Sequence, residues 1–401
     1  MSYKLASELQ VLRVEDVRDT NETRFLHLIR DQQPISQTEV VRRTGLRPGT
    51  VSVVINRLLK AGFLYEAEQA PSKGGRRAVY LQVNAEKAYA VGLSIGVCES
   101  VYVISDFNGR ILSQRTLRTS RTAEPFLRQL GKEIAEHVTS NYGKAKFSAA
   151  GVSVPGLLDR AEGTVIFSPN LGWSNVPVRR LLEQELKLPV IVENDSNAAA
   201  LSELWYGPLE ISSTQSLLFV LVIEGIGTGF ILNGELHIGS SVGSAGFGHM
   251  SLDSGGPKCS CGSTGCLEAL ASDPATVSSF LRNHPEYSTS VHSVHDIAGL
   301  AMSGNQEAGQ QLERTATYLG TAIRGLAHGL SPEMIVVGGQ ITEAWPLVEP
   351  VLRRELQSGY LIEGLSLPQL RRATVERPPL FGAVPIALRS ILKNRKKPAV
   401  T

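Results

Sequence analysis

LLFVLVIEGIGTGFILNGELHIG, residues 217–239, is the stretch of sequence that decides the fold class. It opens on an apolar run, passes through Gly225, Gly227 and Gly229, and reaches the pair Asn233-Gly234. An apolar run bounded by glycines predicts a buried strand, and an Asn-Gly pair between apolar segments predicts a hairpin. Backbone N–H groups approach a phosphate closely only where a residue lacks Cβ. We therefore expect the glycine-rich turn to face a ligand cleft.

The same theme occurs earlier in the chain, and this repetition predicts two α/β halves. Strand, hairpin, helix and strand signals follow one another in the first half, and a further buried strand lies in the second: residues 90–97, 100–117, 125–143, 147–158 and 333–340. We expect a first α/β lobe over residues 88–200 and a second over residues 201–401, with glycine turns from both lobes facing a common cleft.

Three helices are predicted near the start of the chain. The first spans residues 21–33, where apolar side chains recur at helical spacing. The second has Ser36 as its N-cap, Glu39 at capping-box spacing and Gly45 as its C-cap. The third begins at Pro48, whose missing N–H is no loss at the first helical position. The last two, joined by a short turn, predict a helix-turn-helix.

A hairpin wing follows these helices and completes a winged helix-turn-helix over residues 1–83. GFLYEAE and RAVYLQV have the apolar pattern of short strands, and QAPSKGGR between them carries turn residues. A major-groove helix beside a basic wing fits duplex DNA, whereas the alternative is a helical interaction domain with a solvated hairpin. The predicted DNA-contacting residues are Arg47, Thr50, Ser52, Asn56 and Arg57 on the helix and Lys73, Arg76 and Arg77 on the wing.

Charge supports this assignment. The whole chain is nearly balanced, with 40 basic and 38 acidic residues, but residues 41–80 hold 8 basic and 2 acidic side chains. A basic patch of this size is an electrostatic footprint for nucleic acid, although by itself it also describes an ordinary solvated face.

Composition excludes several classes of protein. With 42% apolar and 19% charged residues, the chain has enough core-forming material to exclude a disordered or fibrous protein. It lacks the run of about 18 apolar residues that a membrane span needs, and residues 1–24 lack the pattern of a secretory signal. We expect a cytoplasmic protein with no membrane partner.

Four segments resemble the ROK family of repressors and sugar kinases. They are SPNLGW (168–173), VENDSNAAALSE (192–203), EGIGTG (224–229) and GHMSLDSGGPKCSCGSTGCLEALAS (248–272). The resemblance covers nearly the whole chain, including the winged helix. It implies an actin-like ATPase (ribonuclease H-like) fold of two lobes, with a sugar bound between them.

A zinc site is predicted from spacing alone. His249, Cys259, Cys261 and Cys266 form H-x9-C-x-C-x4-C, the Cys3His set of a closed tetrahedral site. The alternative is a disulfide with spare thiols, which a reducing cytosol disfavours. The zinc would be structural, and the resemblance implies that it positions Glu268 toward the sugar cleft.

The sugar site is predicted around Asn194 and Asp195. Vicinal hydroxyls both donate and accept hydrogen bonds, so they suit a paired amide and carboxylate. Taken alone, the pair also reads as the N-cap of the following helix. The resemblance implies that Asp195 matches the general base of the kinases. The other sugar-contacting positions implied are Gly156, Asn170, His249 and Glu268.

One departure from the family pattern argues against kinase activity. The kinases open with Asp-x-Gly-x-Thr-Lys, where this chain has Ser94 for the Asp, Cys98 for the Thr and Glu99 for the Lys. Phosphoryl transfer depends on charge stabilisation, so the loss of a metal-orienting carboxylate and the gain of a repulsive one should abolish it. Asp195 is then a vestigial base.

A second departure concerns the effector. The family's usual Gly-Glu-x-Gly-His appears here as Gly246-Phe247-Gly248-His249, which places Phe247 where the family has a sugar-gripping Glu. This change is compatible with a modified sugar, with an aromatic stacking platform, or with a protein that senses no sugar.

The sequence thus predicts a DNA-binding transcriptional regulator, with repression as the family's usual sign, whose ROK domain senses a sugar or sugar derivative. The expected partners are a palindromic double-stranded operator and a second copy of the chain, as a homodimer or homotetramer. The alternatives are a bifunctional ATP-dependent sugar kinase with a DNA-binding domain, and a DNA-binding protein with no small effector.

Overall fold

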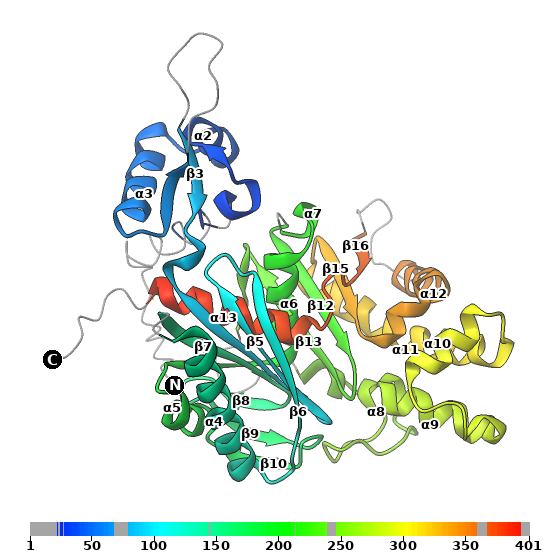
Figure 1. Cartoon of the computed structure of the whole chain (residues 1–401). Helices are drawn as coiled ribbons and strands as arrows, with labels where there is room; N and C mark the ends of the chain where they lie inside the picture. The colour runs from blue at the N-terminus through cyan, green and yellow to red at the C-terminus, as the bar shows by residue number, and fades with distance from the viewer. Residues whose placement is uncertain are drawn as a thin grey trace, which may run out of the picture.

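The computed structural model describes residues 22, 25–26, 28–67, 79–143, 146–212, 214–238, 246–358 and 367–393. A small N-terminal domain sits above two α/β lobes that lie side by side (Figure 1). Each lobe is built on a five-stranded sheet. Within the described ranges, no helix is both long enough and apolar enough to cross a membrane.

The N-terminal domain is a winged helix-turn-helix. Its described elements are β1 (Ile35–Ser36), α2 (Gln37–Thr44), α3 (Pro48–Lys60), β2 (Leu64–Ala67) and β3 (Tyr80–Val83). The three strands form one sheet in the order β1-β3-β2, with β2 and β3 antiparallel as a wing requires. The apolar face predicted for α3 is buried, as Val51, Ile55 and Leu58 are each at most 1% exposed.

The predicted caps of α2 are present, but its capping box is half formed. The Glu39 backbone N–H donates to Ser36 Oγ at 3.2 Å, and Gly45 ends the helix in the left-handed conformation at φ 66°. The Glu39 carboxylate does not return to Ser36. It pairs with Arg42 and Arg43 instead, because two guanidinium groups at helical spacing attract it more strongly than one backbone N–H.

The first lobe is a mixed sheet in the order β11-β7-β4-β5-β6. Its strands are β4 (Tyr89–Ile95), β5 (Glu99–Asp106), β6 (Ile111–Arg118), β7 (Phe147–Val154) and β11 (Val190–Asn194). Helices α4 (Ala123–Tyr142) and α5 (Val178–Leu186) pack on one face, where Val91 and Leu93 of β4 point. A small antiparallel sheet of β8 (Leu157–Asp159), β9 (Thr164–Ser168) and β10 (Trp173–Val176) adjoins this lobe.

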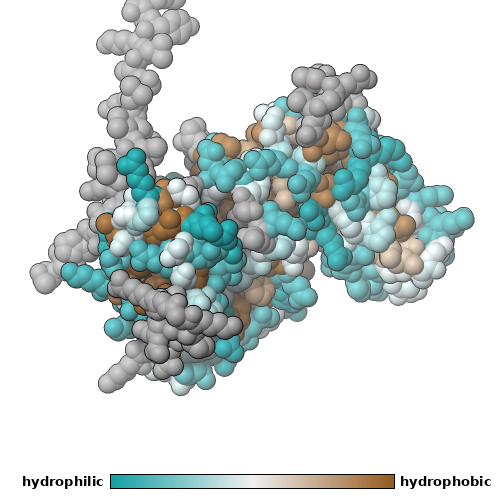
Figure 2. Space-filling model, turned by 90° about the horizontal axis from the view of Figure 1, so that it is seen from above, coloured by the Kyte–Doolittle hydropathy of each residue, from teal (hydrophilic) through white to brown (hydrophobic). Residues whose placement is uncertain are grey.

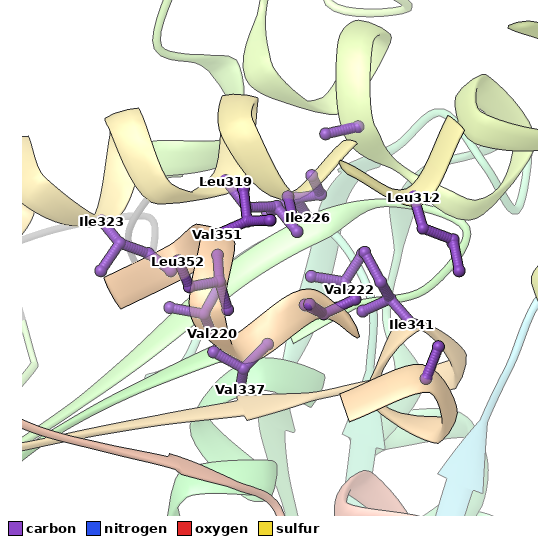
Figure 3. Packing of buried hydrophobic residues seen from close by; sticks show 14 of the residues in the cluster. Val220, Val222, Ile226, Leu312, Leu319, Ile323, Val337, Ile341, Val351 and Leu352 are labelled. Atoms are coloured by element: carbon purple, nitrogen blue, oxygen red, sulfur yellow. The ribbon is translucent and has the colours of Figure 1, made fainter. Parts of the chain in front are cut away.

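The second lobe has the sheet order β14-β13-β12-β15-β16. Its strands are β12 (Ser216–Val222), β13 (Ile226–Leu232), β14 (Glu235–Leu236), β15 (Met334–Gly338) and β16 (Gln369–Arg372). Its helices are α7 (Leu209–Ser212), α8 (Leu267–Ala271), α9 (Asp273–Asn283), α10 (Val294–Met302), α11 (Gln306–Leu330) and α12 (Trp345–Gln357). Figure 3 shows the core, in which Val220 and Val337 of the sheet face Leu319 of α11 and Leu352 of α12.

Two helices fill the centre of the molecule. Helix α6 (Asp195–Tyr206) packs against α13 (Pro378–Lys393) so closely that a Cβ on Gly382 would lie 1.8 Å from the Ala198 carbonyl oxygen. Although α13 follows the second lobe in sequence, it packs on the first sheet: a Cβ on Gly151 of β7 would lie 2.0 Å from the Ala383 carbonyl oxygen. Boundaries drawn along the sequence therefore do not separate the lobes cleanly.

The N-terminal domain is joined to the first lobe by direct contacts. Its buried apolar residues belong to one continuous cluster with residues of β4, β5 and α13. Phe63 packs against Phe107 with ring centroids 4.9 Å apart. The Arg30 guanidinium lies over the Trp205 ring at 4.3 Å and donates from Nη2 to the Trp205 carbonyl oxygen at 2.6 Å. Trp205 belongs to the last turn of α6, so this helix touches the N-terminal domain directly.

Candidate functional site

A cavity of about 450 Å³ lies between the two lobes. It is lined from one side by the ends of β4, β7 and β11 and from the other by the β12–β13 turn and α8. The six residues predicted to contact a sugar all line this one cavity: Gly156, Asn170, Asn194, Asp195, His249 and Glu268. The carboxyl ends of strands in an α/β sheet are the usual position of a ligand site.

Asn194 is the N-cap of α6, as the simpler interpretation of the sequence held. Its Oδ1 accepts from the backbone N–H groups of Ser196 and Asn197 at 2.9 and 3.3 Å, and its Nδ2 donates to the Gly156 carbonyl oxygen at 3.3 Å. This leaves one amide hydrogen for a ligand. Asn194 therefore mainly fixes the start of α6 and the position of Gly156, which has φ 115°.

Asp195 is better placed than Asn194 to contact a molecule in the cavity. Its Oδ1 accepts from Ser196 N at 2.8 Å, and its other oxygen has no partner among the described residues. Burial raises the pKa of Asp195 to about 6, and the neighbouring Glu224 carboxylate adds to this rise against the hydrogen bonds from Ser196. The carboxylate can accept sugar hydroxyls when ionised and can exchange a proton near neutral pH.

Glu193, just before the cap, holds this corner together. It is 2% exposed, and its Oε1 accepts from Asn194 N and from Asn197 Nδ2, both at 2.9 Å. Its other oxygen pairs with Arg160. A buried carboxylate satisfied on both oxygens fixes the first turn of α6, from which Asp195 projects.

Glu268 connects the cavity to the cysteine-containing loop. Its Oε2 accepts from Ile226 N at 3.2 Å and its Oε1 accepts from Ser260 Oγ at 3.3 Å. A Cβ on Gly225 would lie 2.7 Å from Glu268 Oε2 and 3.2 Å from Asn170 Nδ2, so only glycine fits between them. The turn thus brings a carboxylate and an amide to one point of the cavity wall.

The four predicted metal ligands converge. One ligand atom from each of His249, Cys259, Cys261 and Cys266 lies within 4.8 Å of all the others, with His249 Nδ1 3.5 Å from Cys259 Sγ and Cys261 Sγ 3.7 Å from Cys266 Sγ. Metal–ligand bonds of about 2.0–2.3 Å at tetrahedral angles place ligand atoms at such separations. All four cysteines of the chain are free thiols, so the disulfide alternative is not formed. The cluster can hold a metal ion.

Gly225 and Gly227 of the EGIGTG segment line the cavity, as predicted for this turn, and the glycines of the segment also serve a packing purpose. Gly227 and Gly229 lie within β13 rather than in its turn. A Cβ on Gly227 would lie 2.0 Å from Ser196 Oγ, and one on Gly229 would lie 2.4 Å from the Ser196 carbonyl oxygen. These glycines let α6 approach the second sheet, a requirement that is present with or without phosphate.

Of the departures from the kinase pattern, only the first lies at the cavity. Ser94 lines it, so the position of the metal-orienting carboxylate carries a hydroxyl. Cys98 and Glu99 are exposed outside the lining, and Glu99 pairs with Arg377 at 3.2 Å. The predicted repulsion of nucleotide by Glu99 is therefore weakened by its partner and its position.

Phe247 is not the residue that replaces the family's Glu. It packs against the core of the second lobe, while Gly246 lines the cavity. Counted back from His249, the Glu of Gly-Glu-x-Gly-His falls on Gly246, and Phe247 stands at the variable position. Among the described residues, a Cβ on Gly246 would meet only a His249 ring carbon, at 3.9 Å. The cavity has gained space there rather than an aromatic platform.

The predicted DNA-contacting residues divide into three groups. Arg47, Thr50 and Asn56 are exposed on or just before α3, and Ser52 is half-buried with its Oγ accepting from Asn56 Nδ2 at 3.3 Å. Arg57 instead pairs with Glu22 at 2.7 Å, whose side chain is 8% exposed. The wing residues Lys73, Arg76 and Arg77 lie outside the described residues.

The predicted DNA contacts leave out some exposed residues of α3. Val53 is 55% exposed, and Lys60 is also exposed. Together with Gly49 and Asn56 they recur at helical spacing, so they share one face of the helix. Seen from above, the surface over the N-terminal domain mixes hydrophilic and apolar residues (Figure 2). Such a face suits base edges and thymine methyl groups. Glu224, which also lines the cavity, was not among the predicted site residues, although it begins the EGIGTG segment.

Two family models match the chain. The one described as ROK family matches residues 90–389, and the one described as MarR family matches residues 16–78. Among similar proteins, the xylose repressor of Bacillus subtilis is 29% identical over 344 residues, which are 85% of this chain and 88% of that protein. The DNA-binding transcriptional dual regulator NagC of Escherichia coli is 26% identical over 394 residues, covering 96% and 97%.

Solved structures agree with this. A ROK family transcriptional regulator described as a homologue of the E. coli MLC protein matches 94% of this chain and 96% of its own, with a TM-score of 0.77 and 22% identity. A ROK family glucokinase from Streptomyces griseus, solved with glucose and AMPPNP, matches 74% of this chain and 98% of its own, with a TM-score of 0.64 and 27% identity. The regulator match spans the winged helix, and it confirms the predicted fold.

Proposed function

The chain belongs to the ROK family and is, like its relatives, a DNA-binding transcriptional repressor, and from this premise we propose that the cavity senses a sugar or sugar derivative and that α6 conveys its occupancy to the winged helix. One observation carries this proposal. A single helix has Asp195 in the cavity at its first residue and Trp205 against Arg30 in its last turn. One end of α6 therefore lies in the proposed effector site, and the other end contacts the DNA-binding domain.

Helix α6 is suited to transmit movement because its middle is tightly packed. Glycines of β13 and α13 face it at backbone contact, and small side chains fill most of its length. A ligand that draws the lobes together would move α6 as a unit. A ligand shifts a two-state equilibrium only by its differential affinity for the two states, so the contact at Arg30 must differ between them.

Replacing Arg30 by Met tests this coupling. The variant should bind the operator and the sugar with nearly the affinities of the wild type, because Arg30 contacts neither. Sugar should release it from the operator at least about tenfold less effectively, because the cation–π contact and the charged hydrogen bond to α6 are lost. The matched control is Arg128→Met, a half-buried arginine of α4 that also takes part in ion pairs. Normal release by the Arg30 variant would contradict transmission through α6.

For DNA, we propose that α3 enters the major groove of a palindromic operator bound by a homodimer or homotetramer, with Arg47, Thr50, Ser52 and Asn56 near the bases and backbone. The wing residues Lys73, Arg76 and Arg77 would contact phosphate or the minor groove. Their replacement by Ala should weaken binding on all sequences and reduce the salt dependence, whereas Asn56→Ala should change sequence preference. A chain lacking residues 1–83 that still shifts the operator with full affinity would overturn the assignment.

A regulator that binds an operator acts on the chromosome, so we propose that the protein is located in the cytoplasm.

For the effector, we propose that Asp195, Glu268 and Asn170 form hydrogen bonds with sugar hydroxyls, with Gly156 and His249 shaping the wall and Asn194 acting mainly as the cap.

For the metal, we propose one structural Zn²⁺ held by His249 and the three clustered cysteines, a donor set that fits zinc. Bound zinc would fix the loop whose Ser260 donates to Glu268. Metal loss should therefore weaken sugar binding as well as stability.

A bifunctional sugar kinase is the second candidate, favoured by one observation. Asp195 has a pKa of about 6, a value suited to a general base. Ser94 argues against it, because no carboxylate orients a metal at that position. We propose that the chain is not an enzyme, and ATP consumption with a panel of pentoses and hexoses tests this. The third alternative, a DNA-binding protein with no small effector, was suggested by Phe247. Because Phe247 is not part of the cavity lining, it gives that alternative no support.

A further inference from the structure

The cavity has an apolar wall in addition to the polar residues proposed to hold a sugar. Leu157 and Phe167 line it and are 39% and 46% exposed. They are cross-strand partners in the antiparallel pair of β8 and β9. Directly opposed side chains on one face of such a pair touch, so together they make one continuous apolar surface.

The strand pattern explains why this surface is bare. The register of the two strands shifts between Leu157 and Leu158, so that Leu158 pairs with Val165 while Leu157 pairs with Phe167. Adjacent residues of a strand point to opposite faces, which places Leu157 and Phe167 on the face opposite Leu158 and Val165. Leu158 and Val165 are buried in the core of the first lobe, whereas Leu157 and Phe167 are left exposed at the cavity. Exposure of a phenyl ring and a leucine side chain to water is unfavourable, so a ligand that covers both side chains would gain free energy of binding.

The apolar pair is fixed next to the polar site. Gly156 directly precedes Leu157, and a Cβ on Gly156 would lie 2.6 Å from the Phe167 carbonyl oxygen. The Gly156 carbonyl oxygen accepts from Asn194 Nδ2, which neighbours Asp195. A ligand whose hydroxyls reach Asp195 thus has its next group within reach of Leu157 and Phe167.

The cavity also has room for that group. Its volume of about 450 Å³ lies within the roughly 300–1,000 Å³ of sites that enclose drug-sized molecules. Gly246 leaves the wall beside His249 open, as described above. We propose, on the basis of the proposed sugar-sensing function, that the effector is a glycoside: one sugar ring on the polar residues, joined to a second ring whose apolar face stacks on Leu157 and Phe167.

The test compares matched ligands by calorimetry. The probes are D-xylose and D-glucose, their methyl glycosides, their phenyl glycosides in both anomeric forms, and xylobiose and cellobiose. For the sugar that binds, we expect the better ring-bearing glycoside to bind about five- to tenfold more tightly than the methyl glycoside, the gain that one stacked ring typically supplies. Phe167→Ala and Leu157→Ala should remove this gain and leave the affinity for the free sugar unchanged.

The matched control is Leu112→Ala, because Leu112 is 40% exposed on β6 and lies outside the cavity lining. This variant should keep the full preference for ring-bearing glycosides. Equal affinity of the wild type for methyl and ring-bearing glycosides would overturn the inference and leave the sugar sensor intact. Equal weakening of free sugar and glycosides by Phe167→Ala would also overturn it. Failure of every probe to bind would instead contradict the proposed sugar-sensing function itself.

Discussion

Replacing Asp195 by Asn removes the negative charge at the start of α6 and keeps a side chain of nearly the same shape. A hydrogen bond to a charged group contributes about 1.5–3 kcal/mol, so the sugar should bind roughly ten- to a hundredfold more weakly. Operator affinity without sugar should stay nearly unchanged, because the winged helix contacts the opposite end of α6. Release of the operator should then require a correspondingly higher sugar concentration.

The pH dependence gives the same substitution a second readout. The pKa of Asp195 is raised to about 6 in the unliganded protein. A sugar hydroxyl that donates to the carboxylate favours its ionised form and so lowers this pKa in the complex. Affinity should therefore be full above about pH 7 and fall by up to about tenfold per pH unit as the pH drops through 6. The Asn variant has no carboxylate to protonate there, so its affinity should lack this step.

Titration calorimetry of both proteins between about pH 5 and 8 measures this difference, with melting temperatures to check that both remain folded. A wild-type profile without a step, or equal affinities of the two proteins near neutral pH, would refute the role given to Asp195. A coupled kinase assay on the wild type belongs beside it. Sugar phosphorylation that disappears in the Asn variant would establish the bifunctional kinase instead.

Other substitutions test the remaining contacts. Arg57→Ala should lower the free energy of unfolding by about 1–3 kcal/mol, because it removes the charged hydrogen bond between Arg57 and the buried carboxylate of Glu22, and denaturant titration that finds no loss would contradict this. Cys266→Ser should lower zinc content and melting temperature together while Cys98→Ser changes neither; wild type purified without chelators but with well under one zinc per chain would rule the site out. Gly382→Ala should cost about 1–3 kcal/mol or more through its clash with the α6 backbone. Gly299→Ala, whose Cβ would meet nothing within 4 Å among the described residues, should instead be neutral or stabilising in the same unfolding assay.

Features that depend on a few adjacent residues could be predicted from the sequence. The caps at Ser36 and Gly45 and the convergence of the metal ligands follow from short spacings, which constrain local geometry directly. The gathering of the six predicted sugar-contacting residues in one cavity followed mainly from the family resemblance, and only the pair of Asn194 and Asp195 was also argued from hydrogen-bonding chemistry. Asn194 is instructive, since the simpler interpretation as a helix cap describes most of what its side chain does.

Contacts between distant segments could not be predicted. Nothing near Arg30 indicates that it meets Trp205, 175 residues later. The exposed pair of Leu157 and Phe167 reads as ordinary strand sequence, because periodicity does not show the register shift that places the pair on the face away from the core. Phe247 shows a different difficulty. The family motif was aligned one position out of register, so that the core residue Phe247 was taken for the cavity residue Gly246, and the packing of the two residues distinguishes them.

The packing of α13 against the N-terminal domain affects the folding of the nascent chain, because α13 is synthesised last. Helix α3 leaves the ribosome early, but the cluster that its domain shares with the first lobe also contains Leu380 and Val384 of α13. At about 5–20 residues per second, tens of seconds separate the synthesis of these two segments. During that time the DNA-binding domain lacks part of its support. A truncated transcript that ends before the Pro378 codon would therefore yield chains that contain α3 but lack the α13 residues against which its domain packs.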